Sequence, residues 1–366
     1  MPATDALREA ERLMTICNAC RYCEGLCAVF PAMEMRRTFG ADDLNYLANL
    51  CHQCGACYPD CQYSPPHEFN VNIPATLATL RNESYEAYAW PKALSAAFQR
   101  NGLIVTALAA ACVALFIIGF AAIDNPAALF APEVGNFYKL MPHGAMIALF
   151  GAVALYAVAS LTISLRAFWL DINGEAVRAG WAAIGQAVTD TAQLAYLHGG
   201  GGGCTSEDAT PSSARRIYHH FTFYGFLLCF AATSVATIYH YGFGWYAPYS
   251  LRSLPVVLGI LGGIGLLIGP AGLFVLSTRR DPALIDDAHK GTDVAFIGML
   301  FLTGFTGFLL MIFRNGGAMG VLLAVHLGVV LGLFLSLPYG KFVHGLYRFL
   351  ALVKYARERK SGVIVE

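Results

Sequence analysis

Residues 315–340 read NGGAMGVLLAVHLGVVLGLFLSLPYG and contain no Asp, Glu, Lys or Arg. A helix of about 20 apolar residues is long enough to cross the roughly 30 Å hydrocarbon core of a bilayer. The 366-residue chain is 57% hydrophobic and 13% charged. Soluble domains are about 45–50% apolar and about 25% charged. The composition therefore excludes an ordinary soluble globular protein.

Other uncharged segments of similar length precede this one. Together they predict six transmembrane helices, at 103–123, 143–165, 218–240, 254–276, 293–313 and 321–344. Helices are expected because an open β-sheet cannot satisfy its backbone in lipid. The fold class predicted is an all-α membrane protein, with a six-helix bundle over 101–347, a separate domain over 1–100 and a basic tail over 348–366.

The distribution of charge predicts how these helices are oriented. The chain does not open on an apolar stretch with a cleavage site, so no secretory signal peptide is expected. Basic residues concentrate in segments on the side of the termini, at Arg166, Arg178, Arg215, Arg216, Arg279, Arg280 and Lys290, whereas the opposite loops hold Lys139, Arg252 and Arg314. The positive-inside rule then predicts an inner (cytoplasmic) membrane protein with both termini and the loop 166–216 in the cytosol.

Eight of the 11 cysteines form two runs with identical spacing. CNACRYCEGLC at 17–27 and CHQCGACYPDC at 51–61 both follow C-x2-C-x2-C-x3-C, which is typical of bacterial iron–sulfur proteins. Structural zinc sites use two separated ligand pairs, and the cytosol disfavours disulfides. In two-cluster ferredoxins the fourth cysteine ligates the other cluster. The runs thus predict a cytosolic ferredoxin-like head in which one [4Fe-4S] cluster is held by Cys17, Cys20, Cys23 and Cys61, and a second by Cys51, Cys54, Cys57 and Cys27.

The sequence HGGGGGC at 198–204 is the one glycine-rich stretch that resembles a phosphate-binding loop. Such a loop needs a strand before it and a helix N-terminus after it. No apolar strand precedes this stretch, and TSEDATPSS follows it. We therefore expect a flexible cytosolic loop.

Histidines near the ends of the predicted helices are candidate haem ligands. His220 and His240 lie about 30 Å apart on the third span at 1.5 Å per residue, and His326 and His344 lie about 27 Å apart on the sixth. These two spans run antiparallel, so His220 can face His344 near the cytosol and His240 can face His326 near the outer surface. The pattern predicts a cytochrome b-like bundle with one or two b-type haems.

Two alternatives for these ligands stay open. His219 can replace His220, and His143 can replace His240. The small residues Gly225, Gly328 and Gly332 near the ligands would either admit a flat haem or pack helix against helix.

The stretch HLGVVLGLFLSLPYGKFVH at 326–344 resembles the haem-bearing last helix of the respiratory nitrate reductase gamma subunit. The likeness lies in the two histidines, in Pro338 and in the basic residue before the second histidine. It implies that His326 and His344 bind different haems. The partner helix departs from that family, which has a second histidine ten residues after the first, because Phe230 stands there after His220.

Over nearly its whole length the chain is similar to the tricarballylate- or citrate-utilisation protein B family. The shared features are the paired cysteine runs, the glycine-rich loop ahead of RRIYHHFTFYGFLLC and the ending PYGKFVHGLYR. The resemblance implies a subunit that oxidises the reduced flavin of a cytosolic FAD-dependent dehydrogenase and passes electrons to quinone in the membrane. No catalytic acid or base is expected, and the balance of 24 basic against 24 acidic residues favours no nucleic-acid partner.

Two other functions are compatible with these motifs. A transporter with a redox-sensing head would use a broken helix, for which Gly262, Gly263, Gly269 and Pro270 are candidates. The redox module of a flavin-dependent oxygenase, as in cobalamin biosynthesis, would use the same cofactors with electrons flowing toward the flavin.

Overall fold

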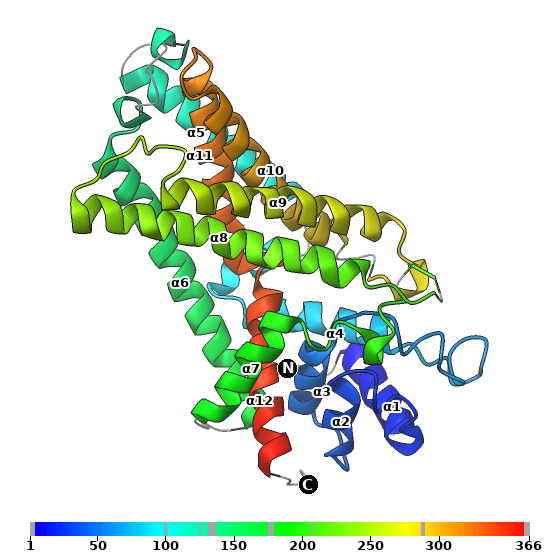
Figure 1. Cartoon of the computed structure of the whole chain (residues 1–366). Helices are drawn as coiled ribbons and strands as arrows, with labels where there is room; N and C mark the ends of the chain where they lie inside the picture. Colours follow the sequence, from blue (N-terminus) through cyan, green and yellow to red (C-terminus); the bar gives the residue numbers. More distant parts are fainter. Residues whose placement is uncertain are drawn as a thin grey trace.

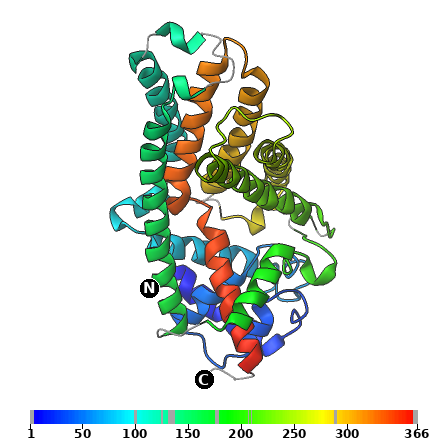
Figure 2. The same cartoon turned by 60° about the vertical axis from the view of Figure 1, so that its left-hand side comes forward.

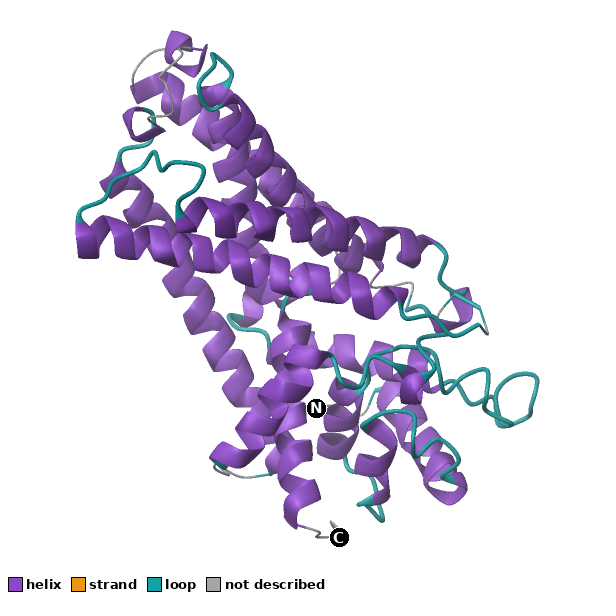
Figure 3. Cartoon of the chain, in the orientation of Figure 1, coloured by secondary structure: helices purple, strands orange, loops and turns teal. Residues whose placement is uncertain are grey.

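The computed structural model describes residues 4–98, 101–123, 126–130, 137–174, 179–205, 207–208, 210–286 and 290–361. Within these residues the chain is helical and has no extended strand, and an isolated bridge joins Cys204 to Ser212 (Figure 3). Long helices form one end of the molecule, which we call the body, and shorter helices form the other, the head (Figure 1). Both chain ends lie at the head. Arg178 and the last residues of the predicted tail, 362–366, fall outside the described residues.

The head is built from helices contributed by both ends of the chain and by its middle. They are α1 (Asp5–Cys20), α2 (Val29–Glu34), α3 (Ala41–Leu50), α4 (Ile73–Tyr88), α7 (Trp181–Gln193) and α12 (Val343–Ser361). The hydroxyl of Thr4 caps α1 by accepting a hydrogen bond from the N–H of Leu7 at 3.2 Å. Leu13, Leu47 and Leu77 from three of these helices are buried in one apolar core, which holds the head together.

Helix α12 replaces most of the basic tail predicted over 348–366. Its residues Leu352 and Tyr355 are buried in the core of the head. Arg36 Nη2 lies 2.7 Å from Glu358 Oε1, and the Arg36 side chain is 0% exposed. A buried guanidinium needs a carboxylate partner, so this ion pair ties the C-terminal helix to the head.

Among the described residues, six helices are long and apolar enough to cross a membrane, as predicted. They are α5 (Asn101–Ile123), α6 (His143–Asn173), α8 (Ala214–Phe243), α9 (Leu254–Thr278), α10 (Lys290–Phe313) and α11 (Met319–Ser336). Large apolar side chains point outward from them, such as Leu103 at 74% and Leu155 at 73% exposure. Such a surface suits lipid and not water, which confirms the class of an all-α membrane protein.

The arrangement of the body differs from the predicted pairing of α8 with α11. Helices α8 and α9 pack side by side and cross α5, α6 and α11 at a steep angle (Figures 1 and 2). Helix α11 packs on α5 and α10. A Cβ atom on Gly225 of α8 would come within 2.9 Å of the α9 backbone, and one on Gly328 of α11 would come within 2.5 Å of the α5 backbone. A Cβ atom on Gly332 would similarly lie 3.1 Å from α5. These glycines therefore pack helix against helix.

The sixth predicted span ends earlier than 344. Helix α11 stops at Ser336, and a 3-10 turn, η7 (Leu337–Tyr339), follows before α12 begins at Val343. Pro338 lies in that turn, where its missing N–H interrupts the helical hydrogen bonds. The hydroxyl of Tyr339 donates to the carbonyl oxygen of Trp90 at 2.9 Å. His344 therefore lies in the first turn of the head helix α12 and not on the helix that carries His326.

Two further segments differ from the sequence-based expectation. The region 166–216, predicted as a loop, contains the last turns of α6 and the helix α7, which packs on α12. Helix α9 runs through Pro270 without interruption, and Gly269 lies against the backbone of α8. The features that favoured a broken transporter helix therefore belong to ordinary helix packing.

Candidate functional site

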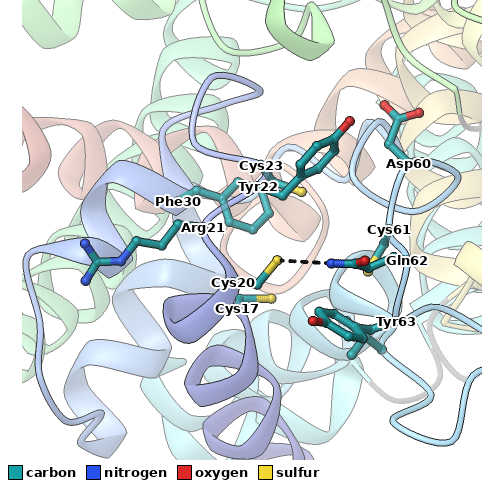
Figure 4. Close-up of a pocket in the computed structure, with 11 residues that line it drawn as sticks. Cys17, Cys20, Arg21, Tyr22, Cys23, Phe30, Asp60, Cys61, Gln62 and Tyr63 are labelled. Atoms are coloured by element: carbon teal, nitrogen blue, oxygen red, sulfur yellow. Dashed lines mark hydrogen bonds between the residues drawn. The ribbon is translucent and has the colours of Figure 1, made fainter.

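Four cysteines from the two runs surround a cavity at the surface of the head. They are Cys17, Cys20, Cys23 and Cys61, which we call the surface quartet because all four are partly exposed. Helix α1 ends at Cys20, and the next residue, Arg21, caps it in the left-handed conformation at φ 57°. The N–H of Arg21 donates to Cys17 O at 2.8 Å. This turn directs Cys17, Cys20 and Cys23 toward the second run, where Gln62 lies beside Cys20 (Figure 4). The cavity has a volume of about 270 Å³.

The other four cysteines of the runs gather between the head and the body. They are Cys27, Cys51, Cys54 and Cys57, which we call the junction quartet. Gln53 at φ 53° and Gly55 at φ 84° flank Cys54 and fold the second run back on itself. A Cβ atom on Gly55 would lie 3.1 Å from the backbone of Thr205, so this turn requires glycine. The space among these residues is about 20 Å³, so the thiols are closely packed.

Burial disfavours the ionised thiol at several cysteines of the two quartets. Burial and the neighbouring thiols raise the pKa of Cys17 and of Cys23 to about 12. Burial also raises the pKa of Cys27 and Cys57 well above the usual value for a thiol. Because thiolates are the ligating form, these groups ionise together only when cations compensate them.

Four thiols are the ligands that each quartet offers. Within the described ranges, no group of three His, Cys, Asp or Glu side chains is placed to hold one metal ion. Each quartet instead surrounds a space with four thiols, and four thiolates are the ligand set of a [4Fe-4S] cluster. A tetrahedral zinc site would need four ligands around one point.

The cysteines are grouped as in two-cluster ferredoxins, where the fourth cysteine of each run joins the other cluster. Cys61 joins the first run, and Cys27 joins the second. The two quartets are neighbours, because Cys23 lies close enough to Cys57 to raise its pKa. Ligation of iron by either quartet stays a prediction.

The glycine-rich stretch 198–204, expected to be flexible, packs against both cysteine runs. A Cβ atom on Gly199 would meet Ala56 at 2.9 Å, and one on Gly200 would lie 3.1 Å from the carbonyl oxygen of Gly25. The glycines therefore permit a close backbone approach to the runs. Beside them the thiol of Cys204 contacts Cys54, whose hydrogen bond lowers the pKa of Cys204 to about 7. Local sequence could not reveal this contact, because the stretch has no apolar periodicity and its partners lie far away in the chain.

Four arginines reach the second cysteine run beside the junction quartet, two from the head helices α4 and α12 and two from the body. We call Arg81, Arg215, Arg280 and Arg348 the junction arginines. Arg81 and Arg348 each donate to Cys51 O at 2.8 Å, and Arg215 and Arg280 both donate to Gln53 O, Arg280 at 3.1 Å. Burial and the neighbouring Arg215 lower the pKa of Arg280 to about 9, and burial and Arg81 lower that of Arg348 to about 10. In the sequence, Arg215 and Arg280 indicated only the orientation of the helices in the membrane.

Two of the candidate haem ligands lie together beside these arginines. His344 Nδ1 bonds the carbonyl oxygen of Lys341, which can only accept, so Nδ1 carries the proton and Nε2 keeps a free lone pair. Burial and Arg348 hold the pKa of His344 well below its usual value, so the imidazole is neutral, as a ligand must be. His219 lies close enough to lower that pKa further. His220 instead stacks on Tyr224, with ring centroids 5.8 Å apart, so the structure favours the alternate His219 beside His344.

His326 lies within the body and bonds a hydroxyl of α10. Its Nδ1 is 2.9 Å from Thr306 Oγ1, and that hydroxyl donates to Leu302 O at 2.7 Å. Because the only proton of the hydroxyl is used, His326 Nδ1 is the donor and its Nε2 keeps a lone pair for a ligand.

His240 has a different partner from the predicted His326. Its ring stacks on that of His143, with centroids 4.0 Å apart and planes inclined by 21°. His143 Nε2 lies 3.0 Å from the hydroxyl of Tyr241. Two rings stacked at this distance leave no room for a haem between them. His143, the predicted alternative to His240 as a haem ligand, thus lies against His240 itself. This arrangement of the two rings does not suit axial ligation of a haem.

Comparison with known proteins agrees with this architecture. Residues 97–363 match the family Citrate utilization protein B, and residues 10–87 match the Citrate utilization protein B Fer4-like domain, which covers both cysteine runs. Citrate utilization protein B of Escherichia coli is 48% identical over 360 residues, which are 98% of this chain and 94% of that protein. No solved structure matches the chain. The chain belongs to the citrate utilization protein B family.

Proposed function

We propose that this chain is the electron-transfer subunit of a membrane oxidoreductase that serves the use of citrate or tricarballylate. A cytosolic FAD-dependent dehydrogenase docks on the head and gives electrons from its reduced flavin to two [4Fe-4S] clusters, one in each quartet. The electrons then reach b-type haem and the quinone pool of the inner membrane. The Fer4-like match supports the iron–sulfur part, and the name of the Escherichia coli relative supports the metabolic setting.

The observation that carries this proposal is the succession of the two quartets between the head surface and the membrane helices. The surface quartet lies beside Tyr22, which is 73% exposed and accessible to a soluble partner. Gln53, which lies in the run between Cys51 and Cys54 of the junction quartet, accepts hydrogen bonds from Arg215 at the start of α8 and Arg280 after α9. Two neighbouring redox sites on this line would join a soluble donor to an acceptor in lipid, while the protein sets their spacing and surroundings.

Three partly buried histidines would hold haem, and in two of them, His344 and His326, the hydrogen bond at Nδ1 leaves Nε2 as the ligating atom. His344 and His219 suit a haem next to the junction quartet, and His326, oriented by Thr306, suits a ligand within the body. Haem would supply one-electron transfer across the apolar interior. For His240 to join such a site, its ring would have to separate from that of His143.

The test is a reduced-minus-oxidised optical spectrum of the detergent-purified protein, with pyridine-haemochrome and non-haem iron assays. We expect about eight non-haem irons per chain and a b-type spectrum. The spectrum should weaken in His344→Ala and stay unchanged in His67→Ala, because His67 packs with Tyr63 and Phe69 on the surface of the head. Iron without haem would remove the transmembrane route, and absence of both cofactors would overturn the whole proposal.

A further inference from the structure

The junction arginines converge on one short piece of the second cysteine run. All four donate to the carbonyl oxygens of Cys51 or Gln53, and Arg81 also donates to the Gln53 side chain at 3.0 Å. They come from four places in the chain: α4, the start of α8, the residues after α9, and α12. Gln53 in turn donates to Leu284 O at 3.0 Å, which fixes the strip that the arginines surround.

Among the described residues, Asp293 is a carboxylate that faces this group, and one carboxylate is fewer than four guanidinium groups. Asp293 of α10 lies close to Arg81 and Arg280, but its carboxylate pairs with Lys341 at 2.8 Å. Arg81 is 3% exposed, so water screens its charge only weakly. A net positive charge therefore lies next to Cys51 and Cys54 of the junction quartet.

The surroundings of the surface quartet have a different charge. Asp60 lines the same cavity as the four cysteines of the surface quartet. Arg21 contributes to the cavity wall, but its side chain points away from the sulfurs and its Nε donates to Asn18 O at 2.9 Å (Figure 4). This arginine is exposed, so solvent and salt screen its charge.

Reduction of an iron–sulfur cluster adds one electron and hence one negative charge. Buried cations stabilise the reduced form more than the oxidised form and raise the reduction potential, as do hydrogen bonds around the ligands. Burial alone acts in the opposite direction, because low polarity disfavours the more highly charged form. At the junction quartet one added charge meets four guanidinium groups, so the cations outweigh the effect of burial.

We propose that the junction arginines make the junction quartet the higher-potential of the two iron–sulfur sites. This rests on the proposed function, since it requires a cluster in each quartet. One electron leaves the reduced surface cluster, which is oxidised, and enters the junction cluster, which is reduced, without proton transfer; the reduced flavin of the partner supplies the electron. The field of the arginines directs the electron toward the membrane, and the body supplies two of the four, Arg215 and Arg280.

The test is a redox titration of the full-length protein, followed by electron paramagnetic resonance. The surface signal is assigned as the one lost in Cys61→Ser. In the wild type the junction cluster should be reduced at the higher potential. Arg280→Gln and Arg215→Gln should each lower the ratio of reduced to oxidised junction cluster at least tenfold at fixed ambient potential, which is 59 mV for a one-electron couple. The surface cluster should not shift.

The matched control is Arg216→Gln. Arg216 is adjacent to Arg215 on the same helix, but it donates to Gln193 O of α7 at 2.7 Å and not to the cysteine run. This variant should leave both clusters unchanged, and Arg280→Lys, which keeps the charge, should retain most of the wild-type potential.

Three results would overturn the inference. The first is a surface cluster of higher reduction potential than the junction cluster in the wild type, and the second is an equal shift of both reduction potentials in Arg280→Gln. The third is a fall of the junction potential in Arg280→Lys as large as that in Arg280→Gln. If a glutamine variant loses its iron, the wild-type order and Arg280→Lys still decide. A wild-type protein without clusters would instead refute the proposed function.

Discussion

Replacing Glu358 by alanine should release α12 from the head. Glu358 accepts from Arg36 Nη2 at 2.7 Å and from the hydroxyl of Tyr46 at 3.1 Å, within a core from which water is excluded. The variant leaves the guanidinium of Arg36 buried with Asp43 as its remaining carboxylate. Because α12 carries His344 and Arg348, loosening it disturbs the site at the junction as well as the fold.

The magnitude follows from these contacts. Breaking a buried ion pair by removing one partner costs about 3–5 kcal/mol, and we expect the lower end, about 3 kcal/mol, because Asp43 still faces Arg36. The lost hydrogen bond from Tyr46 adds about 1 kcal/mol. At about 1.4 kcal/mol for each factor of ten, local opening of α12 should become roughly 10²- to 10³-fold more frequent.

Hydrogen exchange of the detergent-solubilised protein, read by mass spectrometry on peptides from α12, measures this opening. The control is Glu9→Ala, which removes an exposed ion pair with Arg12 at 2.6 Å. Exposed pairs contribute about 0.2–1 kcal/mol, so exchange in the control should change less than about tenfold. The change in protection of α12 in Glu358→Ala is compared with the change in protection of α1 in the control. If the first change is no larger than the second, the buried pair does not hold α12 on the head.

A double variant separates charge from packing. Arg36→Met with Glu358→Leu removes both members of the pair, so no guanidinium is left buried, although Asp43 loses Arg36 and Lys354 loses Glu358. Protection of α12 should return part of the way to the wild-type level. A double variant that opens as readily as Glu358→Ala would show that shape, and not uncompensated charge, causes the loss.

Three further predictions concern the cofactor sites and the helix packing. Cys61→Ser should remove the surface cluster and Cys27→Ser the junction cluster, each lowering non-haem iron from about eight to about four per chain. Thr306→Val removes the acceptor of His326 Nδ1 and should weaken haem binding about 10–100-fold, read by haem titration. Gly328→Ala places a methyl group 2.5 Å from the α5 backbone and should destabilise the body by about 1–3 kcal/mol, read by thermal unfolding.

Each of these three predictions has a matched control or an outcome that would contradict it. Loss of the junction cluster in Cys61→Ser would contradict the exchange of fourth cysteines between the runs. Thr306→Ser keeps the hydroxyl and should bind haem as the wild type does; equal weakening in both variants would mean that the hydrogen bond is unimportant. Gly119→Ala, on α5 with nothing within 4 Å of its new methyl group, should leave the melting temperature unchanged.

Sequence by itself determined the features that depend on local composition and spacing. Six long apolar segments identify membrane helices because solvation by lipid requires an apolar side chain at nearly every position of a span, wherever the neighbouring helices lie. The identical spacing of the cysteine runs and the rule for two-cluster ferredoxins predicted two quartets with Cys27 and Cys61 exchanged, and the cysteines line two spaces in that grouping, while their ligation of iron stays a prediction.

Only the tertiary structure decided which distant residues share a site. The break at Pro338 moved His344 into the head, and the close approach of glycines paired α8 with α9 and so brought His240 to His143. The docking of the glycine-rich stretch 198–204 and the convergence of the junction arginines on Cys51 also went unpredicted. The physical reason is common to all of them: each contact joins residues far apart in the chain, and its energy depends on the crossing of helices and on burial, which no local pattern of residues encodes.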